Sequence, residues 1–195
     1  PCAVSVDRRL TYEQADALLE GGTESEEAEA LDTLWKVAQQ LFEVRVRRGA
    51  ITFFPVEYKV RVLDGSVGLK RIDTFSTSRR LVAEFMINAG ERTGTLLFEK
   101  RVPMIFRNQA APDDDIHWDV ELARDPVFVN STIRKMRRAE VTLQPGRHAG
   151  LGLESYCQVT SPLRRYGDLL MQRQVHAVLT TGVPAYSDGE LLEAM

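Results

Sequence analysis

The stretch that decides the fold of this 195-residue chain is YCQVTSPLRRYGDLL, at residues 156–170. Thr160 or Ser161 supplies a side-chain oxygen suited to capping the free amide groups at a helix start. Pro162 follows at a position typical of the first helical turn, where its missing N–H is not needed. The pattern therefore predicts a long helix from Pro162 to about Thr181.

The two arginines that follow are unusual for the start of a helix. Arg164 and Arg165 would lie in a first turn whose partial positive charge favours acidic side chains. Free amides and two guanidinium groups predict a site for an anion, such as a phosphodiester or a transition state that gains negative charge. The alternative is structural: Arg164 pairs with Asp168 one turn on, and Arg165 lies on the surface. The residues alone leave both interpretations open.

Hydrophobic periodicity outside this stretch predicts a mixture of helices and strand pairs. Helices are expected at 11–20, from Thr23 or Ser25 to near Gly49, from Ser76 or Ser78 to about Phe98, and at 131–139. Extended segments are expected at 50–54, 57–63, 67–72, 102–107, 141–143 and 151–159, with a hairpin turn at Asp64-Gly65. Because helices and strands do not alternate as βαβ units, the predicted fold class is α+β.

Composition places the chain among ordinary globular proteins, since 44% of its residues are hydrophobic and 27% are charged. No apolar run is long enough to span a bilayer, so no membrane association is expected. Cys2 and Cys157 lack the spacing of a zinc site or a disulfide framework, which favours a cytoplasmic location. The net charge of −3 is uneven: residues 11–35 carry only acids, whereas basic side chains dominate residues 131–175. This asymmetry favours an anionic partner for the C-terminal part.

The same sequence also resembles a known family. Residues 156–169 are similar to the C-terminal part of the RNB catalytic domain of the ribonuclease II and ribonuclease R family, which are processive 3′-to-5′ exoribonucleases. Three further segments resemble family motifs: RGAITF at 48–53, LVAEFM at 81–86 and RNQAAP at 107–112. The resemblance covers essentially the whole chain. It implies that residues 1–195 are the C-terminal portion of a single RNB-type nuclease domain.

The resemblance implies roles for residues at the positions where the motifs match. Arg164 and Glu84 would be catalytic, with Arg164 contacting the phosphate near the scissile bond. Phe53 would stack on a base of the single-stranded 3′ end, and such stacking tolerates any base. Four other residues would form or support the same RNA groove: Tyr156, Thr160, Ser161 and Arg165.

Two of these roles have structural alternatives. Without the resemblance, Phe53 is an ordinary core aromatic residue beside Phe54. Glu84 is equally well interpreted as a structural carboxylate that pairs with an arginine such as Arg80. Ala83 stands where the family has a first acidic residue, and this departure weakens a catalytic interpretation of Glu84.

The sequence departs from the family where acid–base and metal chemistry are concerned. Gln109 and Gln172 replace family histidines, and neutral amides donate hydrogen bonds but cannot act as a general base. The resemblance implies magnesium held by aspartates, whose positions are expected upstream of this chain. The run Asp113-Asp114-Asp115 is predicted to be a solvated loop rather than a magnesium site.

The predicted function is that of a magnesium-dependent 3′-to-5′ exoribonuclease, which hydrolyses single-stranded RNA to nucleoside 5′-monophosphates. The chain would bind the RNA phosphate and stack an aromatic side chain on a base. One alternative is a non-catalytic RNA-binding relative, and another is a protein-interaction module that uses the acidic N-terminal helices. Pro1 in place of methionine and an unfinished apolar helix after Ser187 predict a piece of a longer protein, weakly active or inactive alone.

Overall fold

The computed structural model describes residues 3–21, 25–63 and 65–195. Its elements are, in chain order, α1 (Tyr12–Glu20), α2 (Glu26–Arg47), β1 (Glu57–Leu63), β2 (Ser66–Ile72), α3 (Thr77–Glu99), β3 (Phe106–Asn108), the 3-10 turn η1 (Leu122–Arg124), α4 (Pro126–Lys135), β4 (Glu140–Thr142), the 3-10 turn η2 (Ala149–Leu151), α5 (Tyr166–Thr181) and α6 (Asp188–Glu193). In these ranges β1 pairs with β2 and β3 pairs with β4, both antiparallel. The predicted α+β class is confirmed.

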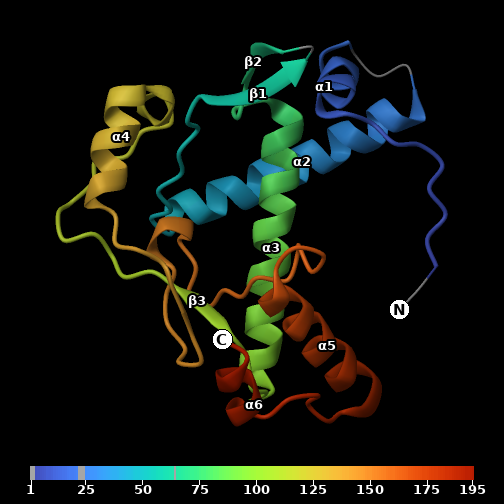
Figure 1. Cartoon of the computed structure of the whole chain (residues 1–195), viewed down its shortest axis with the longest axis vertical. Coiled ribbons are helices and arrows are strands. Elements are labelled where there is room, and N and C mark those ends of the chain that lie inside the picture. Colours follow the sequence, from blue (N-terminus) through green and yellow to red (C-terminus); the bar gives the residue numbers. More distant parts are fainter. Residues whose placement is uncertain (1–2, 22–24, 64) are drawn as a thin grey trace.

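Local capping signals set the starts of the first two helices. Thr11 and Gln14 form a reciprocal capping box at α1, in which each side chain accepts a backbone amide of the other. Ser25 caps α2 by accepting the amide of Ala28 at 3.2 Å. Ser25 was one of two predicted caps, and the other, Thr23, lies outside the described residues. Helix α2 then crosses α3 in the upper half of Figure 1.

The long helix α3 is positioned by contacts from other segments. Ser76 precedes it without a side-chain capping bond, and the amide of Ser78 instead donates to Asp16 Oδ1 of α1 at 2.8 Å. Near its middle, Gly90 allows a second segment to cross closely, because a Cβ there would lie 2.5 Å from the carbonyl oxygen of Cys157. Helix α3 therefore contacts α1 near its start and the segment that precedes α5 near its middle.

The apolar core lies around the C-terminal half of α3, where β3, α5 and α6 meet. Its buried members are Leu97, Val102, Met104, Ile105, Phe106, Cys157, Val159, Leu170, Met171, Val178 and Leu191. Burial raises the pKa of the free Cys157 thiol to about 12, while Cys2 lies outside the described residues. Because α5 and the segment before it share this core, burial fixes their position against α3.

The extended segment predicted at 50–54 is not a strand. The amide of Ile51 donates to the carbonyl of Gly150 at 2.9 Å, and the amide of Phe54 donates to the carbonyl of Ala123 at 3.0 Å. A β-ladder needs one partner strand that follows the segment for several residues, whereas these bonds lead to two different segments. The strand prediction is therefore wrong, although the segment is well anchored.

Three other predicted elements have different boundaries. The helix expected at 131–139 is α4, at 126–135, because Asp125 caps it through the amide of Phe128 (2.8 Å) and Pro126 fills the first position. The strand expected at 102–107 is confined to β3. The extended segment expected at 151–159 is irregular.

The hairpin formed by β1 and β2 confirms the predicted turn. Leu63 pairs with Ser66, and Gly65 between them has a φ of 78°, which favours glycine. Asp64 lies outside the described residues. The hairpin lies at one end of the molecule, beside α1 and the start of α3 (Figure 1), and the side chains at 57–62 and 65–71 are all exposed. None of the helices in the described ranges combines the length and apolar character needed to cross a membrane.

Candidate nucleic-acid interface

The candidate site lies at the start of α5, which the structure places later than the sequence predicted. Helix α5 begins at Tyr166 rather than Pro162, and its N-cap residue is Arg165, whose backbone is extended with φ −128° and ψ 114°. The amide of Arg165 donates to the carbonyl of Ser161 at 3.0 Å, which closes a separate turn before the helix. The prediction that Thr160 or Ser161 caps α5 is therefore wrong.

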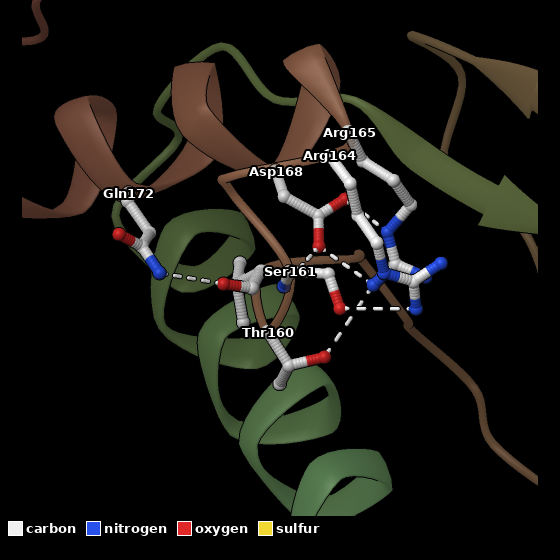
Figure 2. A network of polar contacts seen from close by, with 7 residues as sticks. Thr160, Ser161, Arg164, Arg165, Asp168 and Gln172 are labelled. Atoms are coloured by element: carbon white, nitrogen blue, oxygen red, sulfur yellow. Dashed lines mark hydrogen bonds and ion pairs between the residues drawn. The ribbon is translucent and has the colours of Figure 1, made fainter.

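The buried carboxylate of Asp168, in the first turn of α5, explains this geometry. Asp168 is 1% exposed and accepts the Ser161 amide at 2.8 Å. It also accepts two bonds from Arg165, with Nε–Oδ1 at 2.9 Å and Nη2–Oδ2 at 2.7 Å. Figure 2 shows the carboxylate bonded to both the turn and the guanidinium group. A bidentate partner and a backbone donor offset the cost of burying this charge, so Asp168 holds the turn in place.

The arginine that pairs with Asp168 is thus Arg165, and not Arg164 as the structural alternative predicted. Arg164 is exposed, and its Nη2 lies 3.4 Å from Ser161 Oγ, which is a long contact. The Thr160 Oγ1 lies 3.4 Å from Arg165 Nη2, so both hydroxyls face the guanidinium groups (Figure 2). Within the described residues, no carboxylate forms an ion pair with Arg164. Its charge is therefore available to a ligand, whereas the charge of Arg165 is neutralised.

Tyr156 lies between α3 and the loop that contains η2. Its ring packs over Gly90, where a Cβ would lie 2.3 Å from the ring, and meets the ring of His148 edge-on at 5.7 Å. Its carbonyl accepts the amide of Arg107 at 2.9 Å. Burial raises the pKa of Tyr156, so the hydroxyl stays protonated and can donate a hydrogen bond. The RNA-binding role of Tyr156 stays a prediction.

Glu84 is buried in an ion pair with Arg45 of α2. The two side chains are 7% and 4% exposed, and Arg45 Nε lies 2.9 Å from Glu84 Oε2. Arg45 Nη1 also donates to the carbonyl of Leu151 at 3.1 Å, so the pair joins α2, α3 and η2. This is the structural alternative, with Arg45 in place of Arg80. Arg45 lies on the apolar face of α2, seven residues after the buried Ala38. A charged side chain on that face was the sequence signal for a buried ion pair, and the sequence prediction missed it.

Arg80 has a different environment from the one predicted. Its guanidinium carbon lies 4.6 Å from the Phe75 ring centroid and 5.0 Å from that of Trp35. Burial lowers the pKa of Arg80. The catalytic role of Glu84 stays a prediction, because the geometry shows a structural partner and no substrate-facing group.

Phe53 is half-buried in the irregular segment between α2 and β1. Its neighbour Phe54 packs edge-to-face against Phe75, with ring centroids 4.9 Å apart. Phe53 is therefore less buried than the core aromatic residue of its structural alternative. The stacking role of Phe53 on an RNA base stays a prediction.

The two glutamines that replace family histidines bind backbone groups. Gln109 Nε2 donates to the carbonyl of Arg137 at 2.7 Å, and its Oε1 accepts the amide of Gly150 at 3.0 Å. Gln172 Nε2 donates to the carbonyl of Val159 at 2.7 Å, on the segment that leads to the turn (Figure 2). The predicted capacity of both amides to donate hydrogen bonds is confirmed, and their role is to hold loops.

The run of three aspartates lies on the surface beside the end of α4. Asp113 forms an ion pair with Arg137, and Asp114 Oδ2 lies 3.7 Å from Lys135 Nζ. No group of three or more His, Cys, Asp or Glu in the described ranges is arranged to hold a metal ion. Magnesium requires several oxygen ligands around one point, so these residues do not fit it. No step of a reaction is therefore assigned to a metal held by this chain.

Comparison with known proteins gives the family. The sequence matches the RNB domain over residues 1–181. The chain belongs to the RNB domain family. It is 39% identical over 197 residues to an uncharacterized ribonuclease of Synechocystis, an alignment that covers 99% of the chain and 29% of that protein. It is 34% identical over 189 residues to the chloroplastic/mitochondrial ribonuclease II of Arabidopsis thaliana, covering 93% and 23%. The chain thus spans less than a third of the length of these two RNB relatives.

Solved structures share the RNB fold. The Dss1 exoribonuclease of Candida glabrata matches with a TM-score of 0.80 and 20% identity, over 95% of this chain and 26% of that one. The RNase R of Mycoplasma genitalium in complex with ribose-methylated single-stranded RNA matches with a TM-score of 0.75 and 17% identity, over 93% and 34%. Yeast Ssd1, a pseudonuclease, matches with a TM-score of 0.68 and 20% identity, over 95% and 27%. At these identities the similarity shows the fold alone.

Proposed function

We propose that this chain supplies the RNA-binding turn of a 3′-to-5′ exoribonuclease that hydrolyses single-stranded RNA to nucleoside 5′-monophosphates. The observation that carries the proposal is the difference between two neighbouring arginines. Asp168 fixes and neutralises Arg165, whereas Arg164 is exposed within the same ordered turn. A guanidinium group presented in this way matches the charge and the oxygens of a phosphodiester.

In this proposal the chain's own residues bind and orient the phosphate. Arg164 contacts the phosphate near the scissile bond and stabilises negative charge as it develops there. Thr160 and Ser161 add hydroxyl donors beside the guanidinium groups. Because the Asp168 network orders the turn before RNA arrives, little reorganisation accompanies binding.

The relatives support RNA as the substrate, since two of them are named ribonucleases and one RNase R structure contains single-stranded RNA. We further propose that the protein uses magnesium and that carboxylates outside this chain hold it. A cytoplasmic location is proposed from the sequence alone.

The test compares the intact protein with its Arg164→Ala variant on a 5′-labelled single-stranded oligoribonucleotide in the presence of magnesium. We expect shortening from the 3′ end, a loss of turnover of about 10²–10³-fold in the variant, and a modest loss of affinity. Arg173→Ala removes an exposed guanidinium from α5, the helix that follows the turn, and should keep normal turnover. Equal losses of affinity and turnover would assign Arg164 to ground-state binding. Wild-type turnover in Arg164→Ala would overturn the proposal and favour a protein-interaction module.

A second candidate is a non-catalytic RNA-binding relative. It is favoured by Ala83, Gln109 and Gln172, which replace a family acid and two family histidines, and by the fold shared with a pseudonuclease. The same assay distinguishes the two, because this candidate binds the oligoribonucleotide and leaves it intact.

A further inference from the structure

A second cationic surface lies at the N-terminal end of α3, beside the hairpin. A groove with a volume of about 550 Å³ opens between the hairpin, α1 and the start of α3. Its acidic lining residues are Glu13, Asp16 and Asp73. Its basic lining residues are Lys59, Arg61, Lys70, Arg71 and Arg79. Cations therefore outnumber acids in a chain whose net charge is −3.

The three acids of the groove already have partners. Glu13 accepts a hydrogen bond from Lys70 Nζ at 2.9 Å, which lowers the pKa of Glu13 to about 2. Asp16 accepts the amide of Ser78 at 2.8 Å, and Asp73 accepts a nearby amide at 2.9 Å. Within the described residues, the groove cations that form no ion pair with a carboxylate are Lys59, Arg61, Arg71 and Arg79.

The pairing register of the hairpin places three of the five basic side chains, Lys59, Arg61 and Lys70, on one face, whereas Arg71 pairs with Tyr58 on the other face. Lys59 lies directly opposite Lys70, and Arg61 lies on the same face because alternate residues of a strand share a face. Like charges directly opposite each other destabilise an antiparallel pair of strands. Glu13 forms an ion pair with Lys70 but not with Lys59. The exposed hairpin gains little burial to offset this repulsion. A local rule that the fold compensates only in part, through the Glu13–Lys70 pair, points to a functional site.

We propose that this groove, defined by its five basic side chains, is a second RNA-binding surface that takes the phosphate backbone of single-stranded RNA. The inference rests on the proposed function of the Arg164 turn and adds a separate binding surface to it. A polyanion relieves the repulsion between Lys59 and Lys70, and phosphate contacts of this kind do not depend on base identity. Arg79 is held in the wall of the groove by the Tyr12 ring, with its guanidinium carbon 4.1 Å from the ring centroid.

The two surfaces lie near different points along α3. The groove includes Ser76 at the start of α3, whereas Tyr156, close to the Arg164 turn in the chain, packs over Gly90. At 1.5 Å per residue, these points lie about 20 Å apart along the helix axis. A short oligoribonucleotide therefore occupies one surface, and a longer one can occupy both.

The test measures RNA affinity for the double variant Lys59→Gln/Arg61→Gln of the intact protein. For an oligomer of about 16 nucleotides, we expect affinity to fall about tenfold at low salt. The slope of log K against log salt should become shallower by about 1.4, for two cations removed. An oligomer of about 4 nucleotides should keep near-normal affinity. The control Lys36→Gln/Arg47→Gln removes two exposed cations from α2, outside the groove, and should change neither quantity.

The possible outcomes distinguish a failure of the groove inference from a failure of the function proposed for the Arg164 turn. If the unmodified protein binds neither oligomer, the function proposed for the Arg164 turn fails. If it binds both, and the groove variant keeps its affinity and salt slope, the groove inference alone is overturned. Loss of poly-glutamate binding in the groove variant, with RNA affinity unchanged, would overturn it too and assign the groove to an acidic protein. A thermal unfolding midpoint equal to that of the unmodified protein confirms that the variant is folded.

Discussion

Replacing Glu84 by glutamine separates a structural carboxylate from a catalytic one. Glu84→Gln keeps the shape of the side chain but removes the charge that faces Arg45, whose side chain is only 4% exposed. Breaking a buried ion pair in this way typically costs about 3–5 kcal/mol, because one charge stays buried without a partner. Arg45 keeps its bond to the Leu151 carbonyl, so we expect about 3 kcal/mol. For a chain of this size the unfolding midpoint should fall by about 10 °C.

The assay is urea and thermal unfolding of the unmodified protein and three variants. Arg45→Met/Glu84→Leu removes both charges together and should recover much of the loss, since buried ion pairs and apolar pairs of similar volume are close in stability. Asp32→Asn breaks the exposed pair with Lys36 on α2 and should cost less than about 1 kcal/mol. A Glu84→Gln protein that unfolds normally but has lost RNA turnover would refute the structural assignment of Glu84.

Three further changes probe the packing around the Arg164 turn. Gly90→Ala should lower the free energy of unfolding by about 2 kcal/mol in urea unfolding, because the new Cβ would lie 2.5 Å from a backbone carbonyl oxygen. In the control Gly167→Ala, the new Cβ meets no atom within 4 Å, so the free energy of unfolding should stay the same or rise. Asp168→Asn should lower the free energy of unfolding by about 2 kcal/mol and weaken RNA binding, since the turn loses its anchor; normal stability would exclude this role. Burial lowers the pKa of His148 from 6.5 to about 4. As pH falls, the His148 imidazole therefore binds a proton in the unfolded chain before it does so in the folded one. This contribution of up to about 3 kcal/mol to the free energy of unfolding is fully present above pH 6.5 and is lost by about pH 4. His148→Gln should flatten this dependence between pH 6.5 and 4, and the exposed His176→Gln should not.

Helix starts were predictable where the signal lies within one turn of the chain. The Thr11 capping box and the Ser25 cap each involve partners three residues apart, so the sequence itself places donor and acceptor together. The β1–β2 hairpin is similar, because its turn requires a residue that tolerates the positive φ of Gly65.

The start of α5 was not predictable in the same way. Ser161 and Pro162 are favourable for a cap and a first turn, but the Ser161 amide is taken by Asp168, seven residues on. That bond, together with the Arg165 pair, outweighs the local preference and delays the helix to Tyr166. Local propensity is a weak guide wherever a buried charge must be satisfied.

The partner of Glu84 was missed for a related reason. Arg45 lies 39 residues away and is brought to Glu84 by the crossing of α2 and α3. Which of several arginines reaches a carboxylate depends on that crossing, and no local pattern specifies it. The predicted Arg80 lies on the same helix as Glu84, which is why spacing favoured it.

The position of each carboxylate, more than the number of arginines, decides where we expect this chain to bind an anion. Arg45 and Arg165 are neutralised by Glu84 and Asp168, and both pairs hold the fold together. Arg164 has the same side chain one residue from Arg165, yet its charge faces outward because Asp168 satisfies only its neighbour. The groove beside the hairpin is a related case, since among the described residues four of its five cations form no ion pair with a carboxylate. A net charge of −3 is therefore compatible with the two proposed anion-binding surfaces, because the charge of the whole chain does not fix the charge around each surface.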